Sequence, residues 1–273
     1  MGATDGPTVI KLGLEDAIAG LALSTEAHWN QTKEDWRVFL HDGVVFGIRD
    51  GARLVATAAL LPYSGDNAWI SMVLVTGTHR RRGLATRLVD ACLATARQNG
   101  LTSWLDATPD GATVYGPLGF TPTLQLRRLK LVSPPRETSG SPAVASLDAL
   151  RARDLRATGF DRTALLTAFA QRSGSRIVAA DGSIALVRDG RTARHIGPLF
   201  ADNAVEALAL VHAIAQSETR PLLIDAVASQ ATFLEGLTAS GWTIERPFQR
   251  MRCGPDTTAG EDMPFAVAGP EFG

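Results

Sequence analysis

One strand–turn–helix stretch, residues 67–100, constrains the fold of this chain more than any other part of its sequence. It starts with NAWISMVLV, an apolar run of strand length, and passes through Arg80–Arg82 to Gly83. The following GLATRLVDACLATARQNG repeats apolar residues at spacings of three and four, and Asn99-Gly100 supplies a helix stop. A strand that leads directly into a helix favours an α/β or α+β fold with a sheet covered by helices.

The residues around this stretch extend the same pattern. Alternating or apolar runs predict strands, Asp50-Gly51 predicts a hairpin turn, and Thr32 is the expected N-cap of a short helix. The expected strands are 8–13, the two arms of 43–63, 67–75, 101–108 and 124–132, and the expected helices are 14–29, 32–42, 83–100 and a short helix or turn at 110–119.

A segment rich in Pro, Ser and Gly, VSPPRETSGSPAVAS, interrupts the pattern after these elements and is typical of a linker. We therefore expect a first domain at 1–132, a linker at 133–146, a second domain at 147–254 and a tail at 255–273. The second domain repeats the order of the first loosely, with TASGWT in the place of YGPLGF. This repetition predicts a diverged internal duplication.

Composition excludes several classes of protein. The 273 residues carry a net charge of -1, whereas a general nucleic-acid-binding protein is expected to be strongly basic. Cys92 and Cys253 have neither disulfide-framework nor metal-ligand spacing, so no metal is expected. The N-terminal residues do not resemble a signal peptide, and no apolar run approaches the roughly 20 residues that cross a bilayer. We expect a cytoplasmic protein with no nucleic-acid or membrane partner, either a monomer or a homodimer.

The three arginines before Gly83 have two interpretations. They can form a solvated basic face, but cations at a helix N-terminus oppose its dipole, at a cost of about 0.3–1 kcal/mol each. They can instead complete an anion site, because the first amides of the helix have no intrahelical partner and point outward. Glycine allows close backbone approach, and arginine adds charge-assisted bonds to phosphate oxygens. The second interpretation is favoured.

Two motifs in register carry a resemblance to a known family. Arg80-x-x-Gly83-x-Ala85 after an apolar strand resembles the Q/R-x-x-G-x-G/A signature of the GNAT superfamily of acyl-CoA-dependent N-acetyltransferases. Tyr115-x-x-x-Gly119-Phe120 resembles its second landmark. The resemblance covers roughly the first domain, and the whole chain looks like a bacterial tandem type with a degenerate second GNAT-like domain. It implies two mixed, mostly antiparallel twisted sheets flanked by helices.

The resemblance also implies a cofactor site. Turn amides and side chains would hold the pyrophosphate of acetyl-CoA, and strand backbone splayed from its neighbour would bind the pantetheine arm. The residues implied are Val73, Leu74, Val75, Arg80, Arg81, Arg82, Gly83, Leu84, Ala85 and Thr86. Relatives often place an asparagine shortly before the tyrosine as a further cofactor contact. Here Thr108 or Asp110 would replace it.

Two residues are candidates for acid–base chemistry. Tyr115 matches the tyrosine that serves as general acid in many relatives, and its hydroxyl is a donor with a pKa of about 10. The alternative is a tyrosine that anchors the turn. Asp106 ends an apolar strand, where a carboxylate is costly unless paired, so it is either a site residue or bonded to a loop. Tyr63, His79 and His195 are expected to be structural or solvent-facing.

The segment EAHWNQTKEDW occupies the acceptor-binding loop of the family. Its polar residues Glu26, His28, Asn30 and Gln31 suit a small substrate, or alternatively cap helices anchored by two tryptophans. The expected function is acetyl-CoA-dependent transfer of an acetyl group to a primary amine of a small molecule, by direct attack. A non-catalytic acyl-CoA-binding module is the alternative. The second domain lacks the arginines and the glycine motif, so we expect it to bind no CoA and to shape the acceptor pocket or a dimer surface.

Overall fold

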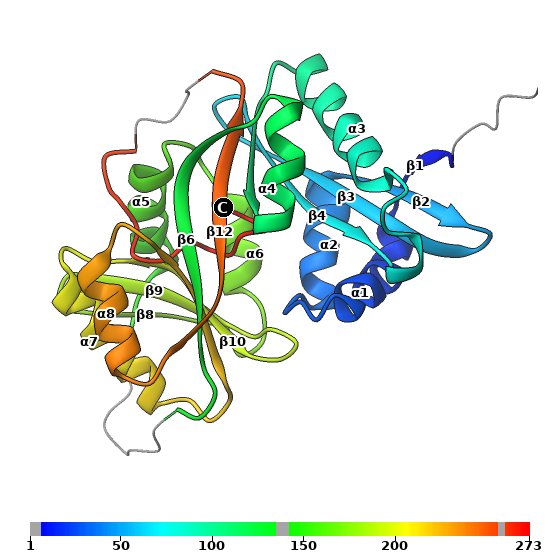
Figure 1. The fold of residues 1–273 in the computed structure, drawn as a ribbon. Coiled ribbons are helices and arrows are strands. Elements are labelled where there is room, and N and C mark those ends of the chain that lie inside the picture. Colours follow the sequence, from blue (N-terminus) through cyan, green and yellow to red (C-terminus); the bar gives the residue numbers. More distant parts are fainter. Residues whose placement is uncertain (1–6, 135–141, 256–259) are drawn as a thin grey trace, which may run out of the picture. The chain divides into compact units, whose positions relative to one another are not determined.

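The computed structural model describes residues 7–134, 142–255 and 260–273 (Figure 1). The chain divides into two compact units, Met1–Trp104 and Leu105–Gly273. The absence of a signal peptide was inferred largely from residues 1–6. The linker expected at 133–146 includes residues 135–141. Both stretches lie outside the described residues.

The first unit contains a sheet with the strand order β1-β2-β3-β4-β5. Neighbouring strands are antiparallel except β4 and β5, which run parallel. Its elements are β1 (Val9–Lys11), the 3-10 helix η1 (Leu14–Asp16), α1 (Ala17–Glu26), α2 (Lys33–Asp42), β2 (Val44–Asp50), β3 (Arg53–Tyr63), β4 (Asn67–Val75), the 3-10 helix η2 (Gly77–His79), α3 (Leu84–Gln98) and the start of β5 (Thr102–Ala107).

Helices cover both faces of this sheet, with α3 on one face and α1 and α2 on the other (Figure 1). Helix α3 buries Leu84 and Leu88 of the stripe expected from the sequence, whereas Ala91 is partly exposed and Ala94 is exposed, and Val89 and Cys92 are buried in addition. Helix α2 begins at the expected N-cap, since the Thr32 hydroxyl accepts a hydrogen bond from the Asp35 amide at 3.2 Å. A Cβ at Gly20 of α1 would lie 2.5 Å from the Trp36 ring, so glycine lets the two helices pack closely.

The second unit contains a sheet with the order β12-β6-β11-β10-β9-β8-β7. Only β10 and β11 are parallel among its described ladders. Its elements are α4 (Pro109–Tyr115), the 3-10 helix η3 (Gly116–Leu118), β6 (Thr121–Leu131), β7 (Ala143–Val144), α5 (Leu147–Thr158), α6 (Thr163–Ala170), β8 (Arg176–Ala180), β9 (Ser183–Arg188), β10 (Arg194–Phe200), α7 (Ala204–Gln216), β11 (Leu222–Val227), α8 (Ala231–Ala239) and β12 (Thr243–Cys253).

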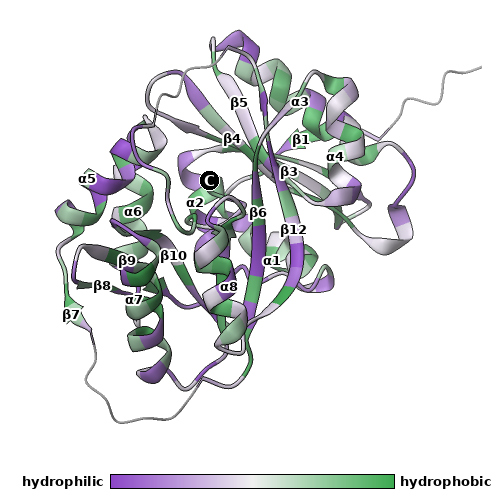
Figure 2. Cartoon of the chain, turned by 60° about the vertical axis from the view of Figure 1, so that its left-hand side comes forward, coloured by the Kyte–Doolittle hydropathy of each residue, from purple (hydrophilic) through white to green (hydrophobic). Residues whose placement is uncertain are grey.

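The division into units differs from the expected boundary at residue 132. Strand β6 pairs along its length with β11 on one side and β12 on the other, so it lies inside the second unit. The core of that unit is built on β10, β11 and the apolar α7, which is largely green in Figure 2. The expected tail also differs, because Phe265–Ala268 and Phe272 are buried in this unit.

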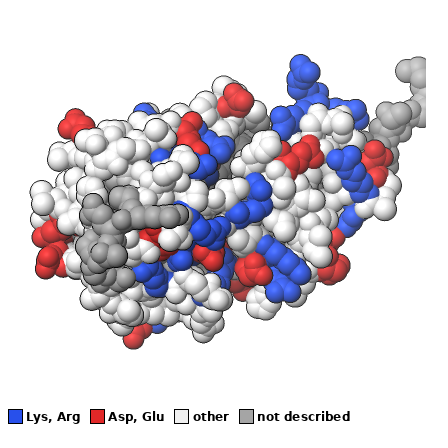
Figure 3. All heavy atoms as spheres, turned by 90° about the horizontal axis from the view of Figure 1, so that it is seen from below, with Lys and Arg blue, Asp and Glu red and all other residues white. Residues whose placement is uncertain are grey.

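The surface charge matches the neutral balance of the sequence. On the face drawn in Figure 3, positive and negative side chains are interspersed. Within the described residues, no helix has the length and apolar character needed to cross a membrane.

Candidate functional site

The first feature of the candidate site is a bulge in β4. The β3–β4 register shifts between the pairs Thr57–Leu74 and Ala59–Ser71, so β4 carries an extra residue there. Met72 has a φ of 50°, in the left-handed region. The buried Thr57 hydroxyl donates to the Met72 carbonyl at 2.9 Å and satisfies that acceptor. The bulge bends β4 immediately before Val73.

The ladder between β4 and β5 is short. In the first unit it covers three pairs, Asn67–Thr102, Ala68–Ser103 and Trp69–Trp104. From residue 70 onward, the ladders described within this unit pair β4 with β3 alone. Backbone groups of β4 that face away from β3, such as those of Val73, are therefore available to a ligand that pairs like a strand, while the Val75 carbonyl already accepts a bond from Arg80 Nε.

The turn after β4 presents the N-terminus of α3 to its surroundings. Gly83 is the N-cap with a φ of 72°, which favours glycine, and no side chain caps the helix there. A Cβ at Gly83 would meet no heavy atom within 4 Å. Leu84 is buried and fixes the helix to the core, whereas Ala85 and Thr86 remain partly exposed. The first amides of α3 thus point toward open space.

The three arginines beside this helix end are all exposed, and two of them also brace the turn. Arg80 Nε donates to the Val75 carbonyl at 3.3 Å, and Arg82 donates to the Thr78 carbonyl at 3.0 Å. Arg81 has a φ of 60°. Uncapped amides, the helix dipole and three guanidinium groups together favour an anion.

Glu26 supports this turn from the end of α1. Its carboxylate accepts a hydrogen bond from the Gly77 amide at 2.7 Å and from the Thr76 hydroxyl at 2.8 Å. The bond from Gly77, followed by the bond from Thr76, lowers the pKa of Glu26 below its ordinary value. Arg53 lies 3.7 Å from the same carboxylate. Sequence reasoning missed this role, because the partners lie about fifty residues apart along the chain.

The other expected acceptor residues lie in the connection between α1 and α2. His28 is exposed with a φ of 59°, and Asn30 is partly exposed. Gln31 is only 4% exposed, and its side-chain oxygen has no hydrogen-bond partner among the described residues. A buried unpaired amide oxygen costs roughly 1–3 kcal/mol, so Gln31 is the residue of this connection most in need of a ligand or water.

The second unit holds the two acid–base candidates. Tyr115 ends α4, is partly buried, and packs its ring 5.9 Å from that of Phe120. The side chain of Asp106 is fully buried and forms a bidentate pair with Arg250, with both N–O distances at 2.8 Å. Burial raises the pKa of Asp106, and the Arg250 charge partly offsets that effect. Thr108 caps α4 by accepting from the Gly111 amide at 3.2 Å.

The second unit contains a buried ionic cluster that the sequence did not predict. Arg128 pairs with both oxygens of Asp225, at 2.7 and 2.8 Å, and His195 Nε2 lies 2.9 Å from the same carboxylate. The three side chains come from β6, β11 and β10. The three residues lie about 30 to 100 positions apart along the chain, so only the sheet order that brings these strands together could have revealed the cluster.

Comparison with known proteins identifies the class to which this fold belongs. A model described as "Acetyltransferase (GNAT) family" matches residues 15–119, and a model described as "Acetyltransferase (GNAT) domain" matches residues 150–264. The chain belongs to the GNAT family and carries two GNAT domains in tandem. It is an acyltransferase, as its resemblance to that family predicts.

The individual relatives share the fold and most of the chain. The uncharacterised N-acetyltransferase YitH of Bacillus subtilis is 25% identical over 252 residues, which cover 86% of this chain and 87% of that protein. A putative acetyltransferase from Pyrococcus horikoshii superposes with a TM-score of 0.83 at 20% identity, over 99% and 97% of the two chains. A tandem GNAT protein from the clavulanic acid biosynthesis pathway superposes at 0.61 with 16% identity, over 91% and 99%.

Proposed function

We propose that the protein is an acetyl-CoA-dependent N-acetyltransferase whose first GNAT domain binds the cofactor. The observation that carries this proposal is the uncapped N-terminus of α3, with open space beside Gly83 and the three exposed guanidinium groups of Arg80–Arg82. This arrangement suits a pyrophosphate, which needs several donors and a positive field. Ala85 and Thr86 supply amides in the same first turn.

The pantetheine arm is assigned to the backbone of Val73, Leu74 and Val75. The bulge at Met72 and the short β4–β5 ladder support this assignment, since they leave the backbone groups on one edge of β4 available. A linear chain that contains two amides can pair with such an edge much as a strand does. Glu26 contributes by holding the Thr76–Gly77 backbone in place.

Acetyl-CoA supplies the acyl group as a thioester. A neutral amine of the acceptor attacks the carbonyl carbon, the new C–N bond forms, and the C–S bond breaks. The nitrogen loses a proton to solvent or a base, and the leaving thiolate takes up a proton. We assign that second proton to the Tyr115 hydroxyl on the strength of its Y-x-x-x-G-F pattern and its partly buried place at the end of α4.

The acceptor is proposed to be a small-molecule amine, with contacts from His28, Asn30 and Gln31. The unpartnered side-chain oxygen of Gln31 supports this, because an amide oxygen accepts from a protonated or neutral amine. For Asp106, the bidentate pair with Arg250 supports the alternative in which the carboxylate is held by the fold. We therefore assign Asp106 no proton transfer.

Titration calorimetry with acetyl-CoA tests the cofactor assignment. We expect binding at sub-millimolar concentration, and weaker binding for Arg82→Ala and for Gly83→Trp. Gly83→Trp fills the open space before α3, and Arg82→Ala removes a charge. Glu235→Ala, an exposed change on α8, is the control. Absence of binding by the wild-type chain would refute the proposal. If the chain binds acetyl-CoA, a free-thiol assay across an amine library distinguishes catalysis from binding alone.

The role of Tyr115 is tested by Tyr115→Phe, which keeps the ring and removes the hydroxyl. We expect kcat to fall by about 10²–10⁴-fold, the range for loss of a general acid. Acetyl-CoA affinity should change little, because the ring packing against Phe120 is retained. An unchanged kcat would remove Tyr115 from the mechanism.

A further inference from the structure

The second GNAT domain repeats the strand geometry of the first. The β9–β10 register shifts between Ile196 and Leu199, as the β3–β4 register shifts near Met72. Strands β10 and β11 then pair in parallel over three residues only, Arg194–Ile196 with Leu222–Ile224. Helix α7 follows β10 as α3 follows β4. The second domain thus contains a splay between two parallel strands, equivalent to the one on which the proposed function rests.

A segment from the end of the chain fills this second splay. Residues 265–267, which we term the internal strand, pair with β10 on one side and β11 on the other. Leu199 N donates to the Ala266 carbonyl and Phe265 N donates to the Leu199 carbonyl, both at 2.9 Å. Val227 N donates to the Phe265 carbonyl, and Val267 N to the Asp225 carbonyl, both at 3.0 Å. The internal strand therefore satisfies backbone groups that the splay would otherwise leave unpaired.

The internal strand is also packed tightly. Phe265 is 4% exposed and sets its ring 5.2 Å from that of Phe233, edge to face. A Cβ at Gly197 of β10 would lie 2.1 Å from the Val267 carbonyl oxygen, so the glycine makes room for the segment. The close approach of the Val267 backbone is thus one reason for a residue without a side chain at this position.

The helix that follows this splay has the opposite electrostatic character to α3. Its N-cap Asn203 accepts from the Glu206 amide at 3.0 Å, and the Asp202 amide donates to the Glu206 carboxylate at 3.3 Å. The Glu206 amide of the first turn and the Asp202 amide just before the helix are thus already bonded within the chain. Helix α3, by contrast, has no side-chain cap.

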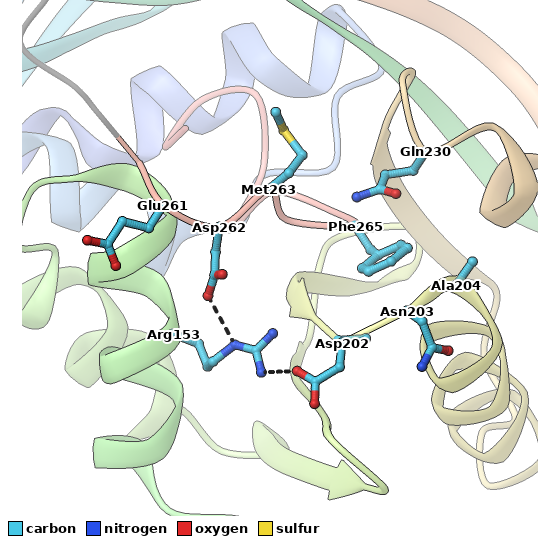
Figure 4. Close-up of a pocket in the computed structure, with 10 residues that line it drawn as sticks. Arg153, Asp202, Asn203, Ala204, Gln230, Glu261, Asp262, Met263 and Phe265 are labelled. Carbon is cyan, nitrogen blue, oxygen red and sulfur yellow. Dashed lines mark hydrogen bonds and ion pairs between the residues drawn. The ribbon is translucent and has the colours of Figure 1, made fainter.

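A cavity of about 400 Å³ lies in front of α7, and its lining includes the start of the segment that leads to the internal strand (Figure 4). Arg153 reaches between two carboxylates in this cavity, at 2.9 Å from Asp202 and 3.5 Å from Asp262. Arg156 contacts the same Oδ2 atom of Asp262 at 3.0 Å. Carboxylates that pair with Arg153 and Arg156 of α5 therefore lie near the start of α7, where α3 has three exposed arginines.

We propose that the internal strand is a built-in occupant of an acyl-CoA-type cleft in the second domain. The peptide backbone of residues 265–267 takes the place of the two-amide pantetheine arm, and carboxylates of the chain take the place of the phosphates. This inference rests on the proposed function, in which the equivalent splay of the first domain binds acetyl-CoA. The chain then binds one acetyl-CoA, and a loosened internal strand exposes a second cleft that accepts an uncharged pantetheine arm.

Hydrogen-exchange mass spectrometry on the full chain tests the proposal, with pantetheine as the probe. The double variant Asp262→Ala/Phe265→Ala removes the ion pairs and ring packing that hold the segment. We expect faster exchange in peptides containing Leu199 and Val227, and severalfold slower exchange again when millimolar pantetheine is added. The wild type and the control Glu235→Ala should show no effect of pantetheine at these peptides.

Two outcomes would overturn the proposal. In the first, the double variant is folded and its Leu199 and Val227 peptides exchange faster than in the wild type, but pantetheine does not slow that exchange. If the double variant fails to fold, Gly197→Ala displaces the segment by the clash with Val267 and is tested in the same way. The other is a wild-type acetyl-CoA stoichiometry of two per chain, a measurement that needs no variant.

The proposed function has its own readout in the same experiment, which is slower exchange of the peptide spanning Thr76–Leu84 on addition of acetyl-CoA. Failure there would reject cofactor binding by the first domain. The exchange at Leu199 and Val227 would still test whether the internal strand occupies a cleft that can accept pantetheine.

Discussion

At the scale of single residues, the second unit holds a histidine in an unusual position. His195 is 2% exposed, with Nε2 bonded to Asp225 and no partner for Nδ1 among the described residues. Burial alone would raise the pKa of Asp225, but the charge of Arg128 and the bond from His195 hold it well below its usual range. The carboxylate is therefore ionised, and Nε2 carries the proton that it donates.

This arrangement predicts acid sensitivity. Burial, with a smaller contribution from Arg188, lowers the pKa of His195 below its ordinary value. The unfolded chain takes up a proton on this ring below about pH 6.5, whereas the folded chain does not until lower pH. The free energy of unfolding then falls as the pH falls through this window, by up to about 1.4 kcal/mol per pH unit.

We expect His195→Gln, which can still donate to Asp225 but cannot titrate, to flatten this dependence. Urea unfolding at several pH values between 7.5 and 5.5 measures the slope for both chains. The variant should be less stable at pH 7.5, since a buried imidazole is replaced, yet lose less stability on acidification. Parallel slopes for the two chains would show that His195 contributes nothing to acid sensitivity.

Single-residue roles were the hardest to predict from the sequence. Arg80–Arg82 and Gly83 could be assigned to a turn because the helix and strand on each side are local patterns. Glu26 and Asp106 could not, because Gly77 and Arg250, their partners in the fold, are far away along the chain. A carboxylate in a sequence gives no sign of whether it meets a ligand or an arginine of its own sheet.

At the scale of elements, the bulge in β4 is what makes one edge of that strand available. The Thr57 hydroxyl supports it by donating to the Met72 carbonyl within the core. Periodicity places β3 and β4 correctly as apolar strands, but it carries no sign of a bulge, because both strands are apolar on both faces. The bulge follows from the pairing register, which the sequence does not specify in so uniform a run.

We expect Thr57→Val to destabilise the chain by about 1–3 kcal/mol, the cost of leaving a buried acceptor unpaired. Valine has nearly the same shape as threonine, so packing is preserved and the missing hydroxyl is isolated. Thr57→Ser is the matched control, since it keeps the hydroxyl. Equal unfolding free energies in urea for the valine and serine variants would mean that the bond does not hold the bulge. Weaker acetyl-CoA binding by the valine variant is the corresponding functional result.

At the scale of the whole molecule, the two compact units of the structure divide after Trp104, not at the residues where the sequence composition changes. The expected linker follows β6, yet β6 lies between β11 and β12 in the second unit. Alternating residues in LQLRRLKLV predict a strand correctly, but local pattern cannot say which sheet receives it. The expected tail differs for a similar reason. Its glycines and prolines are typical of irregular chain, and they give no sign that Phe265–Ala268 are buried. The order of helices and strands in residues 8–132 was predictable because it depends on local periodicity, whereas the duplication was inferred from the repeated order of elements, with TASGWT in the place of YGPLGF.

Because β6 pairs with strands of the second unit, a fragment that ends at residue 132 leaves this strand without its partners. A fragment of residues 1–132 contains β6 but neither β11 nor β12, so both edges of the strand lose the partners that they have in the second unit. A strand without partners exposes backbone donors and acceptors and tends to aggregate. We expect the amides of residues 121–131 to exchange rapidly in the fragment and slowly in the full chain, and the fragment to be poorly soluble. Hydrogen exchange of both proteins under matched conditions measures this difference. Equal protection of β6 in the fragment would instead mean that residues 1–132 form an independent domain, as composition alone predicts.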